Sequence, residues 1–552
     1  MKRTTKFVLM CTGFAMALTG CSPTQTVNSG TSSGNAGMIS QLNFGDFGGG
    51  SNPQVNFNPF SPNKLSGTNL VYESLMTTNH GNCDSVPDLA TKMTWSQDSK
   101  TLTFDIRDNV KWSDGKAFSA EDAAFTFNLM KKYPAIDSFG LWKVLTDVKA
   151  TGNTVVMTFN TSGIPYQQQI TEQLIVPQHV FESAGDPKTF VNDTAVGTGP
   201  YALGTFNPRQ LTMKRNPGYW QADKIKVEQI QYTKADGGGQ VDQLKLANGG
   251  YDTNAMFIPQ IDQAYVQKDP AHNKYWFPAG SSITLDMNLT KKPFNDVNFR
   301  KAISSGIDRK AMIDKAELGY VTQASQTGLK LPIQEPWLDP SIADKGMIAF
   351  DASKADAALT AAGYIKDSSG ARLDPEGKPL AMSFKVPQGW NDWVQAAGLL
   401  QNDMKNLGIS VDVQTPAPSV VEDARATGNY DMVFGVQGGE CNMYRNFAFP
   451  LGSSFTAPVG QKASSNFARW QDPQTDKLLE ELAAAPDTDS QRKIVGQIQQ
   501  IMVNQMPMIP LWYGAVWFEY RTANAVGWPS KDDPYAYPGD QLLWLTRLTP
   551  AK

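Results

Sequence analysis

The sequence predicts an α/β protein built from more than one packed region. Its 552 residues exceed what a single hydrophobic core usually organises, so two to four packed regions are expected. Leu102–Arg107 alternates apolar and polar residues, as a half-buried strand does. Ala120–Leu129 reads as a helix, with the acidic residues Glu121 and Asp122 in its first turn. Strand and helix patterns of this kind intermix along the chain, which is typical of α/β folds.

The N-terminus has the pattern of a secretory signal. Three basic residues precede an apolar stretch, Phe7–Leu18, which is too short to cross the roughly 30 Å hydrocarbon core of a bilayer as a helix. Residues 1–20 are therefore expected to be cleaved off. Leu18-Thr19-Gly20-Cys21 resembles the bacterial lipobox, in which the cysteine receives a diacylglyceryl group before cleavage. The resemblance implies that Cys21 is lipidated and that two acyl chains anchor the protein.

Residues 21–37 are expected to form a flexible tether. They are polar and small, with too little apolar surface to pack. Gly30-Thr31-Ser32-Ser33-Gly34 fits the nucleophile elbow of hydrolases, but that motif needs a strand before it and a helix after it. Neither pattern is present, so chance is the better explanation of the match.

Composition and charge exclude several classes of function. The 49 Lys and Arg residues nearly balance the 53 Asp and Glu residues. No run of basic residues is long enough to bind along the phosphate backbone of a nucleic acid, so nucleic acid is not an expected partner. The histidines His80, His179 and His272 are too far apart in sequence for a His-x-x-x-His zinc helix. A phosphate-binding Gly-x-x-x-x-Gly-Lys-Ser/Thr loop is missing, so any ATP hydrolysis would need a separate protein. We therefore expect no catalytic residue, no metal site and no cofactor.

A succession of motifs identifies a family. Trp95–Phe104 leads into Val110–Gly115 and Ser119–Asp122. Further motifs follow in order: Val196–Tyr201, Arg215–Trp220, Pro293–Val297, Asn429–Asp431 and Met506–Leu511. This succession resembles the family 5 extracellular solute-binding proteins, the oligopeptide- and dipeptide-binding group, from about Ile39 to the C-terminus. Since glycine and proline chiefly set turns, most of the matched residues are expected to shape the scaffold.

The resemblance implies a two-lobed, periplasmic-binding-protein-like fold of type II, cluster C. Lobe I is expected to comprise residues 38–284 and 512–552, with an extra subdomain inserted over about 71–194. Lobe II is expected to comprise residues 285–511. The chain would cross between the lobes twice, with hinges near Gly280–Leu285 and Pro510–Tyr513, and the lobes would close on a ligand by hinge bending.

The same resemblance implies the function. The protein would capture a small oligomeric ligand in the interlobe cleft and deliver it to an ABC permease that is driven by a separate ATPase. It would be a monomer, held by its N-terminal lipid at the outer face of the cytoplasmic membrane. An extracellular hydrolase and a signalling receptor with the same clamp are the remote alternatives.

Three regions are expected to contact the ligand. The loop after the first strand contributes Phe57, Asn58 and Phe60, and the second lobe contributes Trp390 and Trp393. The third region contributes Gln437, Glu440, Asn442 and Tyr444. The two tryptophans, three residues apart on a helical face, serve either core packing or stacking on a ligand. Glu440 either replaces the aspartate that pairs with the ligand ammonium in many relatives or is a solvated surface residue.

Two ligand classes stay open, an oligopeptide and a β-linked oligosaccharide. Members of the resembled family mostly bind peptides. However, Gly527-Trp528-Pro529-Ser530 and Asp533-Pro534-Tyr535-Ala536 resemble the tail of members that bind cello-oligosaccharides. The same stretch also fits an ordered surface loop without ligand contact.

Two cysteines, Cys83 and Cys441, remain once the signal peptide is removed and Cys21 is acylated. A disulfide is permitted outside the cell, so the pair is either bonded or free. If bonded, it would join the first lobe to the second and restrain the opening of the hinge.

Overall fold

The computed structural model describes residues 37–45, 53–137, 140–234 and 239–552. The expected signal peptide, the lipidation site Cys21 and nearly all of the tether lie outside these residues. The described chain contains two large sheets, one smaller sheet and two short two-stranded ribbons.

A seven-stranded mixed sheet forms the centre of lobe I. Its order is β12-β18-β11-β1-β10-β9-β8, and β1 runs parallel to both β10 and β11. The bounds are β1 Leu42–Phe44, β8 Tyr201–Asn207, β9 Gln210–Arg215, β10 Gln229–Thr233, β11 Thr253–Asn254, β12 Asn273–Tyr275 and β18 Glu519–Arg521. Because β18 comes from the C-terminal part, lobe I is assembled from both ends of the described chain.

Short elements surround this sheet. The helices are α1 Thr68–Val71, α5 Gln240–Ala247, α6 Ile261–Ala264 and α15 Gln541–Leu545. Strands β19 Ala525–Val526 and β20 Thr549–Pro550 pair as a ribbon near the C-terminus. Trp528, in the tail that resembles oligosaccharide-binding relatives, is 5% exposed and packs against Trp544 at a ring separation of 5.2 Å. The tail tryptophan therefore stabilises the lobe I core.

A second β unit is inserted between β1 and β8. It contains an antiparallel sheet of order β4-β5-β7-β6 and a β2-β3 hairpin. Its elements are β2 Met76–Asn79, β3 Asp84–Pro87, β4 Ala90–Trp95, β5 Thr101–Ile106, β6 Leu145–Thr151, β7 Thr154–Phe159, α2 Ala120–Lys132, α3 Gln167–Glu172 and α4 Gln178–Phe181. The predicted strand at 102–107 and helix at 120–129 are confirmed as β5 and α2. Apolar residues of this unit and of the seven-stranded sheet belong to one core.

Asp122, in the first turn of α2, holds three segments of the inserted unit together. The Asp122 carboxylate, 7% exposed, accepts hydrogen bonds from the Trp112 indole Nε1 at 3.3 Å, from the Ser119 amide at 3.1 Å and from the Gln178 amide at 3.0 Å. One side chain therefore caps the helix and fixes the segments before α2 and at α4.

Replacing Asp122 with alanine should lower the free energy of unfolding by about 2–3 kcal/mol, because three donors lose their acceptor and the helix loses its cap. Denaturant unfolding measures the change. Glu121→Ala, in the same turn but exposed, is the matched control and should change stability far less. Equal losses for the two variants would contradict this role.

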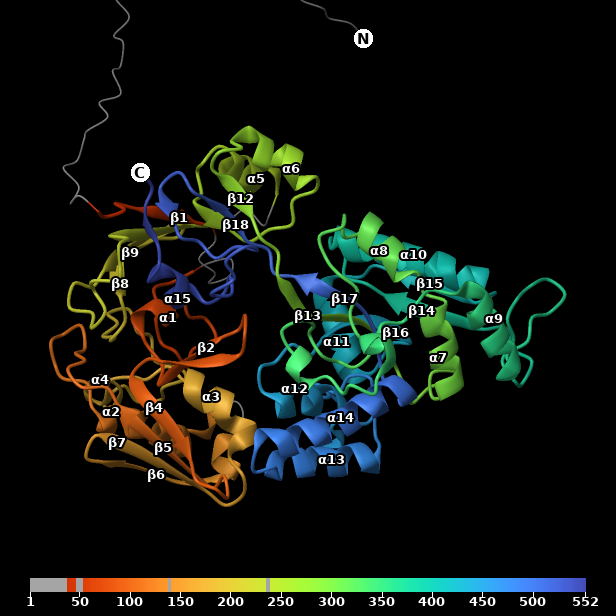
Figure 1. The fold of residues 1–552 in the computed structure, drawn as a ribbon, viewed down its shortest axis with the longest axis horizontal. Coiled ribbons are helices and arrows are strands. Elements are labelled where there is room, and N and C mark those ends of the chain that lie inside the picture. Colours follow the sequence, from red (N-terminus) through yellow and green to blue (C-terminus); the bar gives the residue numbers. More distant parts are fainter. Residues whose placement is uncertain (1–36, 46–52, 138–139, 235–238) are drawn as a thin grey trace, which may run out of the picture. The chain divides into compact units, whose positions relative to one another are not determined.

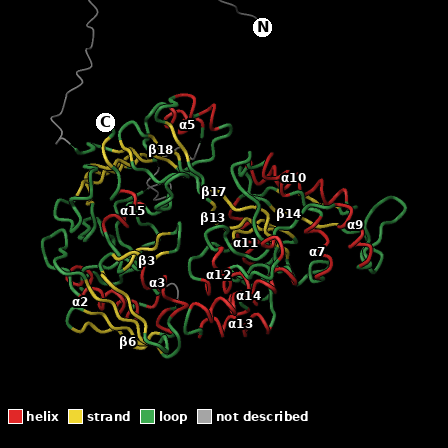
Figure 2. The backbone as a smooth tube through the Cα atoms, viewed as in Figure 1, coloured by secondary structure: helices red, strands yellow, loops and turns green. Residues whose placement is uncertain are grey.

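A five-stranded sheet forms the centre of lobe II. Its order is β15-β14-β16-β13-β17, with β14 parallel to β15 and β16, and β13 antiparallel to β16 and β17. The strands are β13 Ala279–Met287, β14 Ala381–Lys385, β15 Ser410–Gln414, β16 Met432–Gln437 and β17 Ile509–Ala515. The helices are α7 Val297–Ser305, α8 Arg309–Lys315, α9 Ala352–Ala361, α10 Asn391–Asn406, α11 Pro418–Thr427, α12 Met443–Leu451, α13 Pro473–Ala484 and α14 Thr488–Gln505. Figure 2 shows that helices predominate here, whereas strands and loops predominate in lobe I.

The chain passes between the two large sheets twice. The first passage is 276–278, from β12 to β13, and the second is 516–518, from β17 to β18. The predicted hinge segments near Gly280–Leu285 and Pro510–Tyr513 lie inside β13 and β17, which pair with each other in lobe II. The main apolar clusters of lobe II are separate from the main core of lobe I. Short connections between separate cores are the arrangement that hinge bending requires.

Candidate functional site

One edge of the lobe II sheet faces the crossings. Ser282, near the start of β13, pairs with Gln437 at the end of β16. Because β14 is parallel to β16, its carboxyl end lies at the same edge. The segments that follow β14 and β16 therefore begin where the chain passes to lobe I. Loops at the carboxyl ends of parallel strands are a common position for binding sites in α/β proteins.

Trp390 and Trp393 lie at this edge, at the start of α10. Their rings make an edge-to-face pair with centroids 4.7 Å apart, and Trp393 continues to Phe434 at 5.3 Å. Trp390 is 43% exposed, whereas Trp393 is half-buried against the lobe II core. Of the two predicted roles, core packing therefore applies to Trp393. Trp390 exposes its indole to solvent, as stacking on a ligand would require.

The segment after β16 reaches lobe I. The Asn442 Nδ2 donates to the carbonyl of Ile164, just before α3, at 3.0 Å, and the Asn442 Oδ1 caps α12 by accepting from the Arg445 amide at 3.1 Å. Glu440 lies 3.7 Å from Arg445, so this carboxylate already has a cationic neighbour. The Gln437 amide is 3.5 Å from the Asp286 carboxylate, and Tyr444 packs on the second lobe II core.

The predicted lobe I residues have packing roles. Phe57 and Asn58 are both 0% exposed. The Asn58 Nδ2 donates to the carbonyls of Pro187 at 2.6 Å and Phe190 at 2.8 Å, which ties the loop to the end of the inserted unit. Phe60 is half-buried, with its ring 6.2 Å from that of Phe181. In this conformation Phe57 and Asn58 offer no surface to a ligand.

Cys83 and Cys441 are bonded, with their Cα atoms 5.2 Å apart. Cys83 lies between β2 and β3 of lobe I, and Cys441 precedes α12 of lobe II. The bonded alternative is therefore the one present, and the disulfide adds a third covalent connection between the lobes. Figure 1 shows β2 and α3 on the side of lobe I that faces α12.

Lys330 is a lobe II residue at the same interface that the sequence reasoning missed. The residue is 4% exposed, and its ammonium lies over the ring of Tyr537, 5.1 Å from the centroid. The Tyr537 hydroxyl donates to the carbonyl of Ala279 at 2.6 Å, beside the first crossing. Burial lowers the pKa of Lys330, and the charges of Glu440 and Asp540 oppose that effect. In the sequence, the only feature that could have indicated the burial of Lys330 is its position between two leucines.

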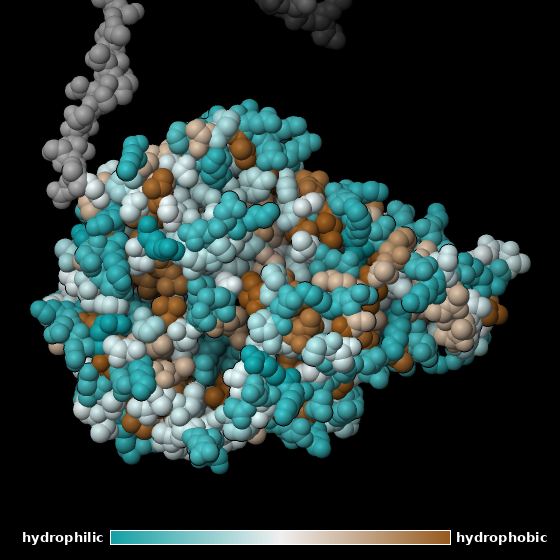
Figure 3. Space-filling view, viewed as in Figure 1, coloured by the Kyte–Doolittle hydropathy of each residue, from teal (hydrophilic) through white to brown (hydrophobic). Residues whose placement is uncertain are grey.

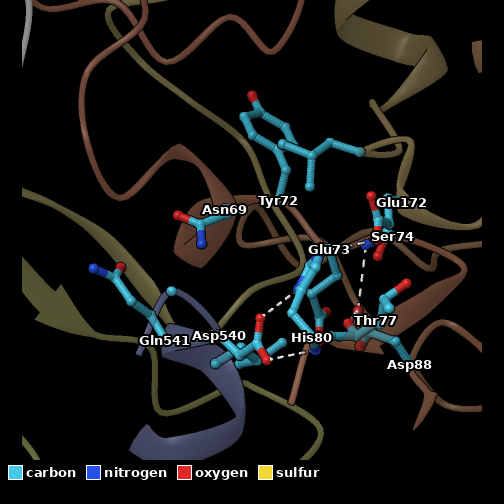
Figure 4. A pocket seen from close by; sticks show the side chains of 14 residues that line it. Asn69, Tyr72, Glu73, Ser74, Thr77, His80, Asp88, Glu172, Asp540 and Gln541 are labelled. Atoms are coloured by element: carbon cyan, nitrogen blue, oxygen red, sulfur yellow. Dashed lines mark hydrogen bonds and ion pairs between the residues drawn. The ribbon is translucent and has the colours of Figure 1, made fainter. Parts of the chain in front are cut away.

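A cavity of about 210 Å³ opens in lobe I next to these contacts (Figure 4). Its walls come from the segment after α1, from the β2-β3 hairpin, from α3 and from the residues before α15. The His80 Nδ1 lies 2.7 Å from the Asp540 carboxylate, and His80 Nε2 lies 3.6 Å from Glu172. The hydrogen bond to Asp540 raises the pKa of His80, although burial opposes it.

Two buried carboxyl groups complete the cavity wall. Glu73 and Asp88 are 1% and 4% exposed. Burial raises the pKa of both groups, and the charge of Glu73 raises that of Asp88 further. The Glu73 Oε1 accepts a hydrogen bond from the Trp220 indole at 2.9 Å.

A further buried acid lies near the tryptophan pair. Glu317, 2% exposed, has a pKa raised from 4.5 to about 8 by burial and then by the charge of Asp392, which lies between Trp390 and Trp393 in sequence. Between pH 4.5 and about pH 8, Glu317 keeps its proton in the folded protein but loses it in the unfolded chain. The free energy of unfolding therefore falls as pH rises through this range.

Glu317→Gln should remove this pH dependence. The thermal midpoint of the variant should rise relative to that of the native protein as pH increases from 5 to 8, and the difference should level off above pH 8. Thermal melts across this range measure the difference. A constant difference at every pH would contradict the raised pKa of Glu317.

No group of three or more His, Cys, Asp or Glu side chains within the described residues is arranged to hold a metal ion. The arrangement as a whole offers an exposed indole on lobe II, charged groups on both lobes and short crossings between them, which suits reversible capture of a solute.

Comparisons with known proteins agree with this geometry. The model of the bacterial extracellular solute-binding proteins, family 5, matches residues 84–457. The di/tripeptide-binding protein 1 of Pseudomonas aeruginosa is 25% identical over 82% of this chain and 84% of its own, and the nickel-binding periplasmic protein of Escherichia coli is 25% identical over 82% and 86%.

Solved structures show the same architecture. The periplasmic oligopeptide-binding protein of an oligopeptide ABC transporter from Thermotoga maritima superposes with a TM-score of 0.84 at 26% identity, covering 93% of this chain and 99% of that one. The same protein with mannohexaose bound gives 0.76 at 25% identity, covering 92% and 98%. The fold is that of the type II periplasmic binding proteins, and the chain belongs to the bacterial extracellular solute-binding proteins of family 5.

Proposed function

We propose that this protein is the substrate-binding component of an ABC importer and that it captures an oligopeptide between its two lobes without altering it. The observation that carries the proposal is the pair of three-residue crossings between two separate cores, with side chains of both lobes meeting at Asn442, Lys330 and Tyr537. The peptide-binding relatives support the ligand class. A separate ATPase would drive the permease, because the sequence lacks a phosphate-binding loop.

Ligand binding favours the closed arrangement of the lobes. A ligand that touches both lobes binds the closed form more tightly than the open form, and it shifts the population by that difference in affinity. The importer then distinguishes loaded from empty protein by the distance between the lobes. Affinity near micromolar or tighter, about 8 kcal/mol or more, is expected for a scavenger of dilute solutes.

An oligosaccharide is the second candidate ligand. The half-exposed indole of Trp390 supports it, because an indole face stacks on sugar rings. The mannohexaose complex of the Thermotoga maritima protein also supports it. Trp528, in the tail that resembles oligosaccharide-binding members, is buried in the lobe I core and does not itself offer a stacking surface.

Native mass spectrometry tests the function. The purified protein is mixed with equal amounts of di- to hexapeptides and mannohexaose, and bound masses are read before and after incubation. We expect one bound ligand per chain with an unchanged mass, and a peptide as the dominant species. Fragmented or otherwise modified ligand would contradict a transport role.

We further propose that Cys21 is lipidated and anchors the protein outside the cytoplasmic membrane. The lipobox-like segment before Cys21 supports this anchor. Across the described part of the chain no helix has the length and apolar character to traverse a bilayer. Hydrophilic residues predominate on the face drawn in Figure 3.

Cys21→Ala should move the protein from the membrane fraction to the soluble fraction, because no acyl chains can then be attached. Immunoblots of separated fractions measure the shift, and Cys11→Ala, within the expected signal peptide, is the matched control. Unchanged membrane association of the Cys21 variant would refute the lipid anchor.

A further inference from the structure

Tyr320 of lobe II reaches lobe I beside the crossings. The residue follows α8, and its hydroxyl donates to the carbonyl of Ile258 at 3.2 Å and accepts from the amide of Ile261 at 2.9 Å. Its ring packs against two separate apolar clusters, one in lobe II and one in lobe I that contains Ile258 and Ile261. In Figure 1, α6 and α8, the helices next to these contacts, lie on opposite sides of the passage between the lobes. Tyr320 therefore takes part in the packing of both lobes.

The Ile261 amide is the first amide of helix α6. The first amides of a helix have no acceptor within the helix, and Gln260, the residue before α6, provides no side-chain hydrogen bond. The Tyr320 hydroxyl supplies the missing acceptor from the other lobe. When the lobes separate, water has to replace this hydroxyl, so the hydrogen bond favours the arrangement in which the lobes meet by a modest amount.

A strained turn directs Tyr320 toward lobe I. Leu318 and Gly319 have φ values of 53° and 78°, in the left-handed region. A leucine rarely adopts this conformation, because its Cβ crowds the backbone, and Leu318 is 38% exposed, so packing compensates little of the strain. The Tyr320 amide donates to the carbonyl of Glu317 at 3.0 Å and closes the turn. Backbone strain of this kind collects at functional positions.

Both crossings pack against the Tyr320 ring. Phe277 of the first crossing and Trp517 of the second meet edge to face with their centroids 4.8 Å apart. They lie 5.6 Å and 6.2 Å from the centroid of Tyr320. Phe257 of lobe I completes this hinge ring cluster, 5.3 Å from Trp517 and 6.2 Å from Tyr320. A rotation of lobe II about the crossings changes these contacts, so it has to rearrange the cluster.

We propose that Tyr320 is a positioning residue that holds the two lobes together at the hinge and thereby sets the affinity for every ligand of the cleft. It acts on the population of the closed form, and a larger population of that form raises the apparent affinity for any ligand by the same factor. The effect on affinity rests on the proposed function. The effect on the lobes of the ligand-free protein does not.

Tyr320→Phe tests the proposal, with Tyr275→Phe as the matched control. The Tyr275 ring lies 4.9 Å from that of Phe277, but its hydroxyl donates to Asp262 within lobe I at 3.3 Å. Small-angle X-ray scattering of the ligand-free proteins should give a larger radius of gyration for Tyr320→Phe than for the native protein, and Tyr275→Phe should match the native protein. The disulfide stays intact, because two fixed places still allow the lobes to rotate about the line that joins them. Thermal melts verify that both variants fold.

Calorimetric titration with trialanine and with mannohexaose measures the effect on affinity. Tyr320→Phe should weaken the binding of each probe that the native protein binds by the same factor, about fivefold, which corresponds to the loss of one ordinary hydrogen bond. Tyr275→Phe should keep the native affinity.

The outcomes separate this inference from the proposed function. An unchanged radius of gyration in Tyr320→Phe, or an equal increase in both variants, overturns the inference whatever the probes do. Native affinity of Tyr320→Phe for a probe that the native protein binds also overturns it. So does a factor that differs more than twofold between the probes, because Tyr320 would then act by contact with one ligand. If the native protein binds neither probe, the proposed function fails and the scattering alone decides the inference.

Discussion

Removing the disulfide should have the largest effect of any single substitution. Cys441→Ser is expected to destabilise the protein and to speed ligand release at least tenfold, because only the two crossings then join the lobes covalently. Cys83 and Cys441 are separated by 358 residues in sequence, and the chain-entropy model assigns a loop of that length about 5–6 kcal/mol. The measured stabilisation is smaller than this value to the extent that the unfolded chain retains structure.

Thermal melts and stopped-flow tryptophan fluorescence measure the two effects. Cys83→Ser and the double variant should match Cys441→Ser, and reductant should convert the native protein to the same behaviour while leaving the variants unchanged. If the variants release ligand at the native rate, the disulfide does not restrain opening, and the interlobe contacts at Asn442 and Tyr537 hold the lobes instead.

Truncating Trp390 should weaken ligand binding by about tenfold or more. Its indole is the exposed end of a chain of rings that runs through Trp393 and Phe434 into the lobe II core, so it is held rigidly at the edge facing the crossings. A rigid aromatic surface gains binding energy at small entropic cost, and its loss is worth about 1.5 kcal/mol or more. Folding should suffer little, because the residue is 43% exposed.

Calorimetry on Trp390→Ala and Trp390→Phe distinguishes stacking from packing. The phenylalanine variant should retain most of the affinity, because it keeps an aromatic face. Native affinity in the alanine variant would exclude Trp390 from the binding site, and equal losses in both variants would show that the indole N–H is the important group.

Local patterns in the sequence predicted local structure well. The alternation at Leu102–Arg107 and the acidic first turn at Glu121 and Asp122 gave β5 and α2, because period and capping depend on neighbours in the chain. The ordered motifs predicted the family. The Asp122 hydrogen bonds show how one of these motif residues serves the scaffold: its carboxylate joins three segments of the chain.

Residues joined across long distances in sequence were beyond such reasoning. Asn58 reads as a polar loop residue, but the carbonyls of Pro187 and Phe190 bury it completely. The acidic cavity combines Glu73 with Asp540, and nothing in either local pattern connects them. Cysteine counting left bonding at Cys83 and Cys441 open, because pairing depends on how closely the lobes approach.

Calorimetric titration of the purified protein, followed by recovery of the ligand, tests the central claim most directly. Peptides of two to six residues and mannohexaose are titrated singly, and the bound ligand is released and weighed by mass spectrometry. The account predicts one site per chain, a dissociation constant near micromolar or tighter, and a ligand of unchanged mass. Absence of binding by every probe, or a chemically converted ligand, would contradict it.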